Sequence, residues 1–173
     1  MFILDQFAIK HIHKSTKTGG ILEYLIAIFA VSFNNEIVAF VYGLGLFLIP
    51  YSPQNILICS LPLLGLLITY ILKRRISRPR PLLFSPRADA LKFDLRGREK
   101  NHSMPSGDSL QASLFWTLMC YYQVVPFWLG AVLAFLTMLA RVYYMCHYPT
   151  DTVLGAILGM SLFYLIKSIL ALP

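Results

Sequence analysis

The chain has 173 residues, of which 57% are hydrophobic and 13% are charged, and its formal net charge is +7. Soluble domains are about 45–50% apolar and about 25% charged, so this composition argues against a soluble protein. It predicts a single polytopic membrane domain over residues 1–173. The positive charges gather between apolar runs, so we expect lipid headgroups or phosphates as partners and no nucleic acid.

The first residues, MFILDQFAIKHIHK, alternate apolar and polar side chains. They lack the basic stretch followed by a continuous apolar core that marks a signal peptide. The pattern predicts that residues 1–18 form an interfacial segment lying against the membrane. A frayed tail is the alternative interpretation.

Two short apolar runs follow, at residues 21–33 and 37–49, and Asn34, Asn35 and Glu36 separate them. Polar residues are costly in the middle of a bilayer. We therefore place this break at a membrane surface, as a turn between two short or tilted spans. One long span with a buried polar break is the alternative.

Four further apolar segments cover residues 55–72, 109–125, 126–141 and 151–172. They approach or reach the roughly 20 residues that a helix needs to cross hydrocarbon. Pro126 marks the break between the second and the third of them. The predicted fold is therefore all-α, a membrane bundle of about six transmembrane helices with a polar catalytic face at one membrane surface.

Counting helices brings three polar segments to one membrane surface: LKRRISRPRP, NHSMPSGDS and ARVYYMCHYPTD. The helix that ends at Leu72 delivers the first, and the next two helices descend and return. Between Lys73 and Lys100 the chain has ten Lys or Arg and three acidic residues, which predicts a basic loop over residues 73–105. A juxtamembrane patch that only sets topology would have the same composition.

The first two segments offer groups that bind anions. Lys73 and Arg80 supply positive charge, and the guanidinium fork can bind two phosphate oxygens at once. Ser106 and Gly107 begin a helix, whose free N–H groups and positive dipole end attract anions. Ordinary capping of that helix by Ser106 is the alternative interpretation.

The third segment contains Arg141, His147 and Asp151. A carboxylate that accepts the N–H of one imidazole nitrogen leaves the other nitrogen free to act as a nucleophile. A surface histidine beside a helix-capping aspartate is the alternative. Taken together, the three segments predict phosphoryl transfer through a phosphohistidine, with no metal and no other cofactor.

The three cysteines do not change this interpretation. Cys59, Cys120 and Cys146 lack the spacing of a metal site, and none is followed by an arginine six residues later. We therefore expect no disulfide, no metal centre and no cysteine phosphatase loop.

These segments resemble the three signatures of the type-2 phosphatidic acid phosphatase superfamily, in the same order. The matching residues are Lys73 with Arg80-Pro81, then Pro105-Ser106-Gly107, and then Arg141, His147 and Asp151. The resemblance implies that His147 is the nucleophile and Asp151 its orienting partner. It also implies a set of phosphate ligands: Lys73, Arg80, Arg141 and the amides of Ser106 and Gly107.

Two positions depart from the superfamily pattern. The third signature usually begins Ser-Arg and here begins Ala140-Arg141, which removes one hydroxyl. The second usually ends in a histidine that protonates the leaving alcohol, and here Asp108 is the candidate at that position. A helix N-terminus and a basic cluster both favour the ionised carboxylate, which is a poor acid. A bound phosphate dianion would instead favour the protonated carboxyl of Asp108. His102 is a candidate to replace Asp108 as the general acid. Alternatively, a good leaving group would need little help from an acid.

Within the superfamily, the compact size and the basic loop resemble bacterial lipid A 1-phosphatases. The implied activity is hydrolysis of a phosphate monoester of a lipid in the bilayer, with the 1-phosphate of lipid A as the expected substrate. Phosphatidylglycerophosphate and undecaprenyl diphosphate are alternatives. A non-enzymatic protein that binds anionic lipids would explain the charges, but not His147 with Asp151.

The loop residues Leu91, Phe93 and Leu95 lie among charges, and we expect residues 82–104 to form an interfacial helix that grips the headgroup. Three spans before Lys73 would place the N-terminus opposite the active side. Its lysines are then cytoplasmic by the positive-inside rule. This predicts a multi-pass protein of the bacterial inner membrane with its active site facing the periplasm. The basic loop argues the other way, but its charges have a use in binding phosphate.

Overall fold

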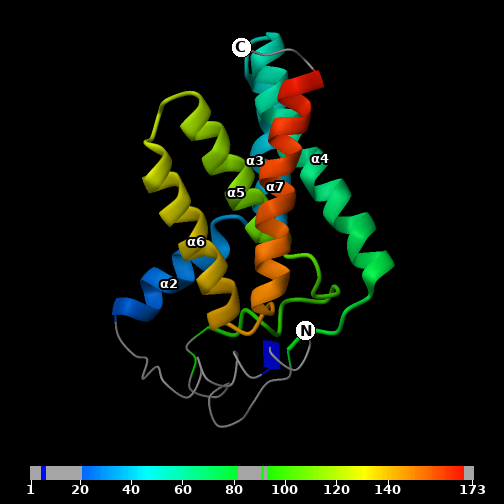
Figure 1. The fold of residues 1–173 in the computed structure, drawn as a ribbon, viewed down its shortest axis with the longest axis vertical. Coiled ribbons are helices and arrows are strands. Elements are labelled where there is room, and N and C mark those ends of the chain that lie inside the picture. Colours follow the sequence, from blue (N-terminus) through cyan, green and yellow to red (C-terminus); the bar gives the residue numbers. More distant parts are fainter. Residues whose placement is uncertain (1–4, 7–20, 82–90, 92, 170–173) are drawn as a thin grey trace.

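The computed structural model describes residues 5–6, 21–81, 91 and 93–169 (Figure 1). The described part of residues 21–169 contains six α-helices and no strand. In chain order they are α2 (Ile21–Val31), α3 (Asn35–Leu48), α4 (Pro53–Ile76), α5 (Gly107–Tyr121), α6 (Phe127–Tyr143) and α7 (Pro149–Ile169). The predicted all-α architecture is confirmed, whereas the paths of the first helices differ from the prediction.

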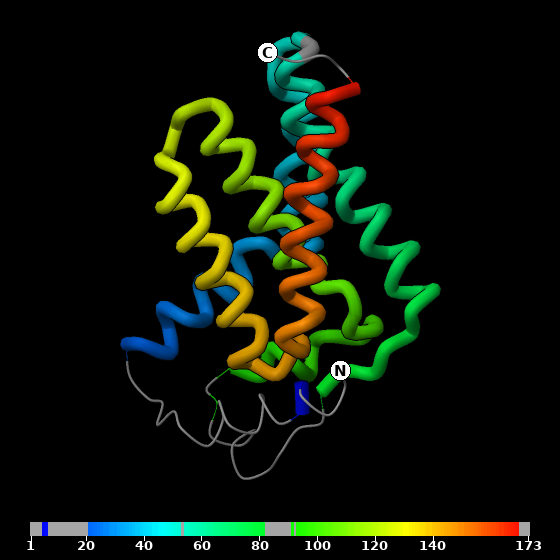
Figure 2. Tube along the Cα trace, viewed as in Figure 1, coloured from blue at the N-terminus to red at the C-terminus, as the bar shows by residue number. Residues whose placement is uncertain are grey.

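The long helices run alternately up and down the molecule (Figures 1 and 2). In the view of Figure 1, α3 runs upward, α4 downward, α5 upward, α6 downward and α7 upward, while α2 lies obliquely at the lower left. We call the lower end, where α4 and α6 end and α5 and α7 begin, the polar end. The three polar segments of the sequence meet there, as helix counting predicts.

Helix α5 is the centre of the bundle, because residues 107–114 of this helix are all buried. Its apolar side chains pack on those of α4 and α7 in a cluster of Leu57, Leu61, Leu114, Leu118, Leu162 and Phe163. Its buried polar side chains are satisfied: Gln111 donates to the carbonyl of Pro62 and Ser113 to that of Ala156, each at 2.9 Å. Apolar packing and hydrogen bonds therefore both hold α5 in place.

The outer surfaces of the helices are apolar. Phe47 on α3 is 87% exposed, and Trp128 on α6 and Leu165 on α7 are also exposed. Large apolar patches on the outside and buried charges inside are the reverse of a soluble protein and suit a lipid environment. By length and composition, α4 and α7 can each cross a membrane. Helices α2 and α3, bent by 54°, pass the same test only together, as one broken span or as a re-entrant loop. Helices α5 and α6 are shorter, with 15 and 17 residues.

The position of Asp5 contradicts the three crossings predicted before Lys73. Asp5 forms an ion pair with Arg78 at 2.7 Å and accepts a hydrogen bond from Thr150 at 2.6 Å, so it lies at the polar end. Helix α2 has 11 residues, or about 16 Å, and hydrocarbon is about 30 Å thick. Apolar composition alone does not distinguish such a helix from one that crosses. Apart from Asp5 and Gln6, the predicted interfacial segment lies outside the described residues.

The interfacial helix predicted over residues 82–104 is wrong in its described part. Residues 82–90 and 92 lie outside the described residues, and residues 91 and 93–104 contain turns and bends but no helix. Leu91, Phe93 and Leu95 pack instead against a cluster that includes Ala30 of α2 and Tyr143 of α6. These apolar side chains therefore anchor the loop to the protein.

Two glycines allow α7 to approach α5 closely. A Cβ atom at Gly155 would lie 2.3 Å from the carbonyl oxygen of Ser106, and one at Gly159 would lie 2.2 Å from Oγ of Ser113. Small residues four positions apart on a helix permit such close contact between backbones in membrane proteins. The contact also fixes Ser106, and with it the start of α5.

We expect Gly155→Ala to lower the Tm by roughly 2–12 °C, because overpacking costs about 1–3 kcal/mol and each kcal/mol shifts Tm by about 2–4 °C at this size. Gly43→Ala is the matched control, since nothing lies within 4 Å of a Cβ atom placed there. Thermal unfolding of both variants in one detergent tests this. Equal Tm values for the two variants would contradict the tight α5–α7 contact.

Candidate active site

Helix α4 delivers the first group of cations. It runs past the predicted end at Leu72 to Ile76, so Lys73 lies in its last turn, where the helix dipole favours positive charge. Ser77 ends the helix in the left-handed conformation, with φ of 50°, and its N–H donates to the carbonyl of Lys73. The chain then turns beneath the bundle and places Arg78 and Arg80 against the segment around His147.

The imidazole of His147 is fixed by a backbone carbonyl. Its Nδ1 lies 2.7 Å from the carbonyl oxygen of Ser103. A carbonyl oxygen only accepts hydrogen bonds, so Nδ1 carries the proton and donates it. In the neutral ring Nε2 is then left with its lone pair, facing Arg80 Nη1 at 3.4 Å.

His147 is also held in its neutral form. It is 0% exposed, and burial lowers its pKa well below the ordinary value, with the nearby cations, led by Arg80, lowering it further. Because the ring is uncharged at neutral pH, Nε2 keeps the lone pair that a nucleophile needs.

The hydrogen bond predicted between His147 and Asp151 is replaced by an indirect link. Nδ1 of His147 and Oδ2 of Asp151 are 3.9 Å apart, which is too far for a hydrogen bond. Oδ2 instead accepts from the N–H of Tyr148 at 3.0 Å and from the hydroxyl of Ser103. Asp151 therefore fixes Ser103, and the carbonyl of Ser103 in turn orients the ring of His147.

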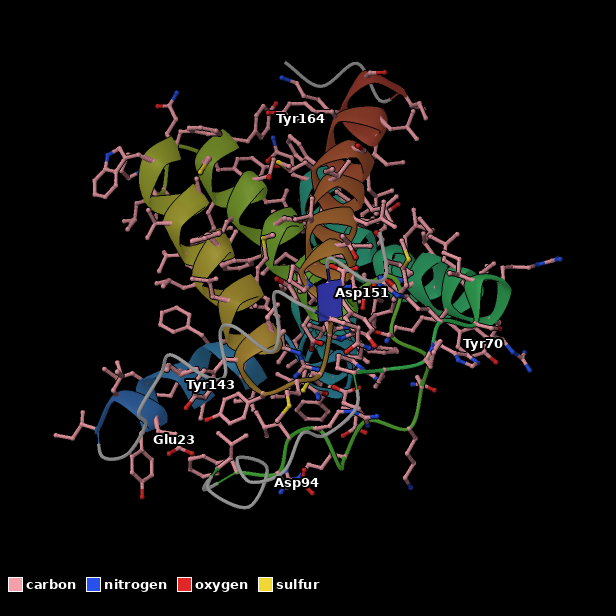
Figure 3. The ribbon with its side chains drawn as sticks, turned by 60° about the horizontal axis from the view of Figure 1, so that its bottom comes forward. Glu23, Tyr70, Asp94, Tyr143, Asp151 and Tyr164 are labelled. Atoms are coloured by element: carbon pink, nitrogen blue, oxygen red, sulfur yellow. The ribbon has the colours of Figure 1, made fainter. Side chains whose placement is uncertain are left out.

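Arg78 connects this arrangement to the N-terminal residues. It donates to Oδ1 of Asp151 at 2.6 Å and to Asp5 at 2.7 Å, and it lies over the ring of Tyr148 at 4.2 Å. Figure 3 brings the polar end forward and shows Asp151 at the start of α7, close to residues 5–6, whereas Tyr164 lies toward the other end. Asp151 is thus held at Oδ1 by Arg78 and at Oδ2 by Tyr148 and Ser103.

Arg80 joins two loops of the polar end. Its guanidinium donates to the carbonyls of Asn101 at 2.7 Å and Cys146 at 2.6 Å, and to Oε2 of Glu99 at 2.8 Å. Arg80 is 7% exposed, so these contacts hold it beside His147 in a buried position.

Arg141, at the end of α6, carries the second buried guanidinium. It donates to the carbonyl of Ala30 at 3.0 Å and forms ion pairs with Glu99 and, at 3.0 Å, with Asp108. Its Nε is buried and has no hydrogen-bond partner among the described residues. An oxygen of a bound anion would accept a hydrogen bond from this buried donor and so satisfy it.

The start of α5 contributes less to anion binding than the sequence predicts. The N–H of Ser106 donates to the backbone carbonyl of Asp151 at 3.0 Å, so it is occupied within the protein. Ser106 also caps α5 by accepting from the N–H of Ser109 at 3.3 Å. Gly107 is needed for space, because a Cβ atom there would lie 2.8 Å from Oδ1 of Asn35. Its own N–H belongs to the first turn, which lacks intrahelical acceptors.

Asp108 points into the same cluster. Its Oδ2 lies 3.0 Å from Nη2 of Arg141 and 3.9 Å from Nε2 of His147. Arg141 favours the ionised carboxylate, and the burial of Asp108, which is 4% exposed, opposes it. The side chain of His102, the candidate substitute, is exposed.

Two cavities open at the polar end. The arginine cavity, about 610 Å³, is lined by residues that include Arg141, Glu99, Asp108 and Glu36. The lysine cavity, about 500 Å³, is lined by residues that include Lys73, Arg74, Lys100 and His102. Asn35, Lys100 and Asn101 line both cavities, so the two spaces adjoin. Among the described residues, no group of three or more His, Cys, Asp or Glu side chains could hold a metal ion.

The structure thus brings together Lys73, Arg80, Asp108, Arg141, His147 and Asp151, and it adds four residues that the sequence did not single out: Asp5, Arg78, Glu99 and Ser103. Glu99 is an acid within a basic loop, which is a signal for an internal ion pair. Ser103 acts through its backbone carbonyl, for which residue type gives no signal.

Comparison with known proteins supports the sequence resemblance at the level of the superfamily. Residues 55–171 match the model of the PAP2 superfamily. The chain is 32% identical over 112 residues to phosphatidylglycerophosphatase B of Bacillus subtilis (strain 168), a match that covers 58% of this chain and 50% of that relative. The chain therefore spans about half the length of this curated relative.

A solved structure shares the fold. The crystal structure of a transmembrane PAP2-type phosphatidylglycerolphosphate phosphatase from Bacillus subtilis matches with a TM-score of 0.69 and 24% identity, over 97% of this chain and 85% of that one. Both matches are named as phosphatidylglycerophosphate phosphatases, whereas the sequence resemblance pointed to lipid A 1-phosphatases. With three signature segments meeting at one end and more than half of the chain matching, the chain belongs to the PAP2 superfamily, whose membrane phosphatases hydrolyse phosphate monoesters.

Proposed function

We propose that the protein is a membrane lipid phosphatase that removes a phosphate monoester from a lipid headgroup through a phosphohistidine at His147. The observation that carries the proposal is the setting of Nε2, which lies 3.4 Å from Arg80 while Ser103 holds Nδ1. A neutral, oriented imidazole whose unprotonated nitrogen faces a buried guanidinium is suited to attack on a phosphate.

In this mechanism, Lys73, Arg80 and Arg141 bind the phosphate oxygens and stabilise the negative charge of the transition state. Nε2 of His147 attacks phosphorus, and the P–O bond to the lipid alcohol breaks as the N–P bond forms. The departing oxygen takes up a proton. Water then attacks the phosphohistidine, the N–P bond breaks, and inorganic phosphate and neutral imidazole are released.

For the substrate we propose phosphatidylglycerophosphate, in place of the lipid A 1-phosphate expected from sequence. The curated relative, which is 32% identical, supports this choice through its name. The adjoining cavities also support it, because phosphatidylglycerophosphate carries a phosphodiester close to its monoester. Arg74 and Lys100 also line the lysine cavity and offer that diester positive charge.

Phosphate release from a panel of lipids tests the function. We expect purified protein in mixed micelles to give its highest kcat/KM on phosphatidylglycerophosphate, with lower values on lipid A and undecaprenyl diphosphate. A highest value on lipid A would restore the expectation from sequence. Binding of anionic lipid without release from any substrate would favour the non-enzymatic alternative.

For the location, we propose a bacterial inner membrane with the polar end toward the periplasm. One support for this orientation is lost, because Asp5 lies at the polar end. The basic loop still does not decide against it, because Lys73, Arg80 and Arg141 are buried in the site and their charge has a use other than setting topology.

Cysteine labelling of intact cells tests the orientation. In a background with Cys120→Ala, we expect an impermeant reagent to modify Arg98→Cys at the polar end and to spare Val124→Cys at the other end. Arg98 and Val124 are both exposed in the structure. The reverse pattern would place the polar end in the cytoplasm.

A further inference from the structure

A carboxylate of the protein itself occupies the space between the two buried arginines. Oε2 of Glu99 accepts from Nη2 of Arg80 at 2.8 Å, and Oε1 accepts from Nη2 of Arg141. Burial opposes ionisation of Glu99, but Arg141 and Arg80 outweigh it and lower the pKa to about 2. Glu99 is therefore an anion at neutral pH, bound where the mechanism requires phosphate oxygens.

Among the described residues, the groups around Nε2 of His147 are closed off from solvent. His147 is 0% exposed, and the side chains of Arg80 and Arg141 are each 2% exposed. A substrate must therefore displace part of the cluster. Lys73, Asp108 and Arg141 lie on helices. Of Arg80 and Glu99, which both lie on loops, Glu99 lines the arginine cavity and has the more exposed side chain, 17% against 2%.

Charge balance points to the same residue. In the described cluster, the cations of Lys73, Arg80 and Arg141 face the carboxylates of Glu99 and Asp108, which leaves one positive charge in excess. A phosphate dianion added to this set would leave one uncompensated negative charge in a buried site, which is unfavourable. With Asp108 ionised, departure of Glu99 brings the site with its dianion to balance.

We propose that Glu99 is an internal competitor for the phosphate site, which leaves the two arginines when substrate binds and so raises the affinity that any anion needs in order to enter. The inference rests on the proposed function, because it concerns the same site. A membrane presents phosphodiester headgroups in large excess, and each carries a single charge like that of Glu99. Such a monoanion gains little by replacing the carboxylate, whereas a phosphomonoester dianion gains more from the same cations. Glu99 thereby keeps bulk phospholipid out of the site.

Anion binding by Glu99→Gln tests the proposal without relying on turnover. In calorimetric titrations in detergent, we expect Glu99→Gln to bind inorganic phosphate at least about 10-fold more tightly than the wild type does. The reason is that the two charge-assisted hydrogen bonds from the arginines to the Glu99 carboxylate no longer compete with the ligand. Dimethyl phosphate, a monoanion, should gain by the same factor, since a competitor that leaves completely affects both ligands equally.

Glu36→Gln is the matched control. Glu36 lines the same cavity, and no ion pair joins it to either arginine among the described residues. Its replacement removes one negative charge without removing a competitor, so we expect a smaller gain than that of Glu99→Gln. Equal gains for the two variants would reduce the effect to general electrostatics and overturn the proposal.

Two further outcomes would also overturn it. One is unchanged or weaker phosphate binding by folded Glu99→Gln, and the other is a gain confined to phosphate, which would mean that Glu99 stays in the site and repels the dianion. If the Gln variant does not fold, Glu99→Asp carries the test, because the shorter carboxylate cannot bridge both arginines and phosphate should bind more tightly. Wild-type protein that neither binds phosphate nor hydrolyses lipid would refute the proposed function itself.

Discussion

Replacing His147 with Gln is expected to lower kcat/KM on the lipid substrate by about 10⁴-fold or more, the scale seen when a covalent nucleophile is removed. Gln can keep a hydrogen bond to the carbonyl of Ser103, which now accepts from Nδ1 at 2.7 Å. It offers no nitrogen lone pair to phosphorus. The loss should therefore fall on chemistry and leave phosphate binding largely intact.

Steady-state kinetics and thermal unfolding together check this expectation. The Tm of His147→Gln should stay close to that of the wild type, since the ring is neutral and the variant keeps its polar contact. Activity above about 1% of wild type in a well-folded variant would show that another group attacks phosphorus.

Replacing Asp108 with Asn is expected to have an effect that depends on the leaving group. On a lipid phosphate, whose leaving alkoxide needs a proton, kcat should fall by about 10²–10⁴-fold if Asp108 supplies it. On p-nitrophenyl phosphate, whose phenolate leaves unprotonated, the loss should be much smaller. The geometry permits this role, since Oδ2 of Asp108 lies 3.9 Å from the attacking Nε2, and a bound dianion favours protonation of the carboxyl.

The same pair of substrates distinguishes the alternatives. Equal losses on both substrates would show that Asp108 acts by positioning Arg141, which it contacts at 3.0 Å. A loss with His102→Gln that is larger on the lipid substrate would assign the proton to His102, which lines the lysine cavity. The assay thus identifies the general acid. Asp108 stands at the signature position where the superfamily usually has the histidine that protonates the leaving alcohol.

The sequence predicts much of this site because its signatures lie at helix ends. Lys73 ends α4, Ser106 caps α5, Arg141 lies in the last turn of α6 and Asp151 in the first turn of α7. Long apolar runs determine the alternation of these helices, and the alternation brings their ends together. The substitution of Asp108 for histidine is also visible from sequence alone.

The remaining features depend on tertiary contacts that residue type does not encode. The carbonyl that orients His147 could belong to any residue, so the sequence suggested Asp151 in place of Ser103. An apolar helix of 11 residues has the same composition whether it crosses or lies along the bundle, which is why α2 was counted as a span. Glu99 is one acid among many cations until the fold shows that it bridges Arg80 and Arg141.

The central claim, a phosphohistidine at His147, is tested most directly by trapping the intermediate. Wild-type protein is mixed with substrate carrying a radiolabelled monoester phosphate, quenched within one turnover in denaturant, and digested for mass spectrometry. We predict a label that is stable in base, labile in acid and located on His147, and absent from His147→Gln. Steady release of phosphate with no labelled protein at any time, or a label on another residue, would contradict the account.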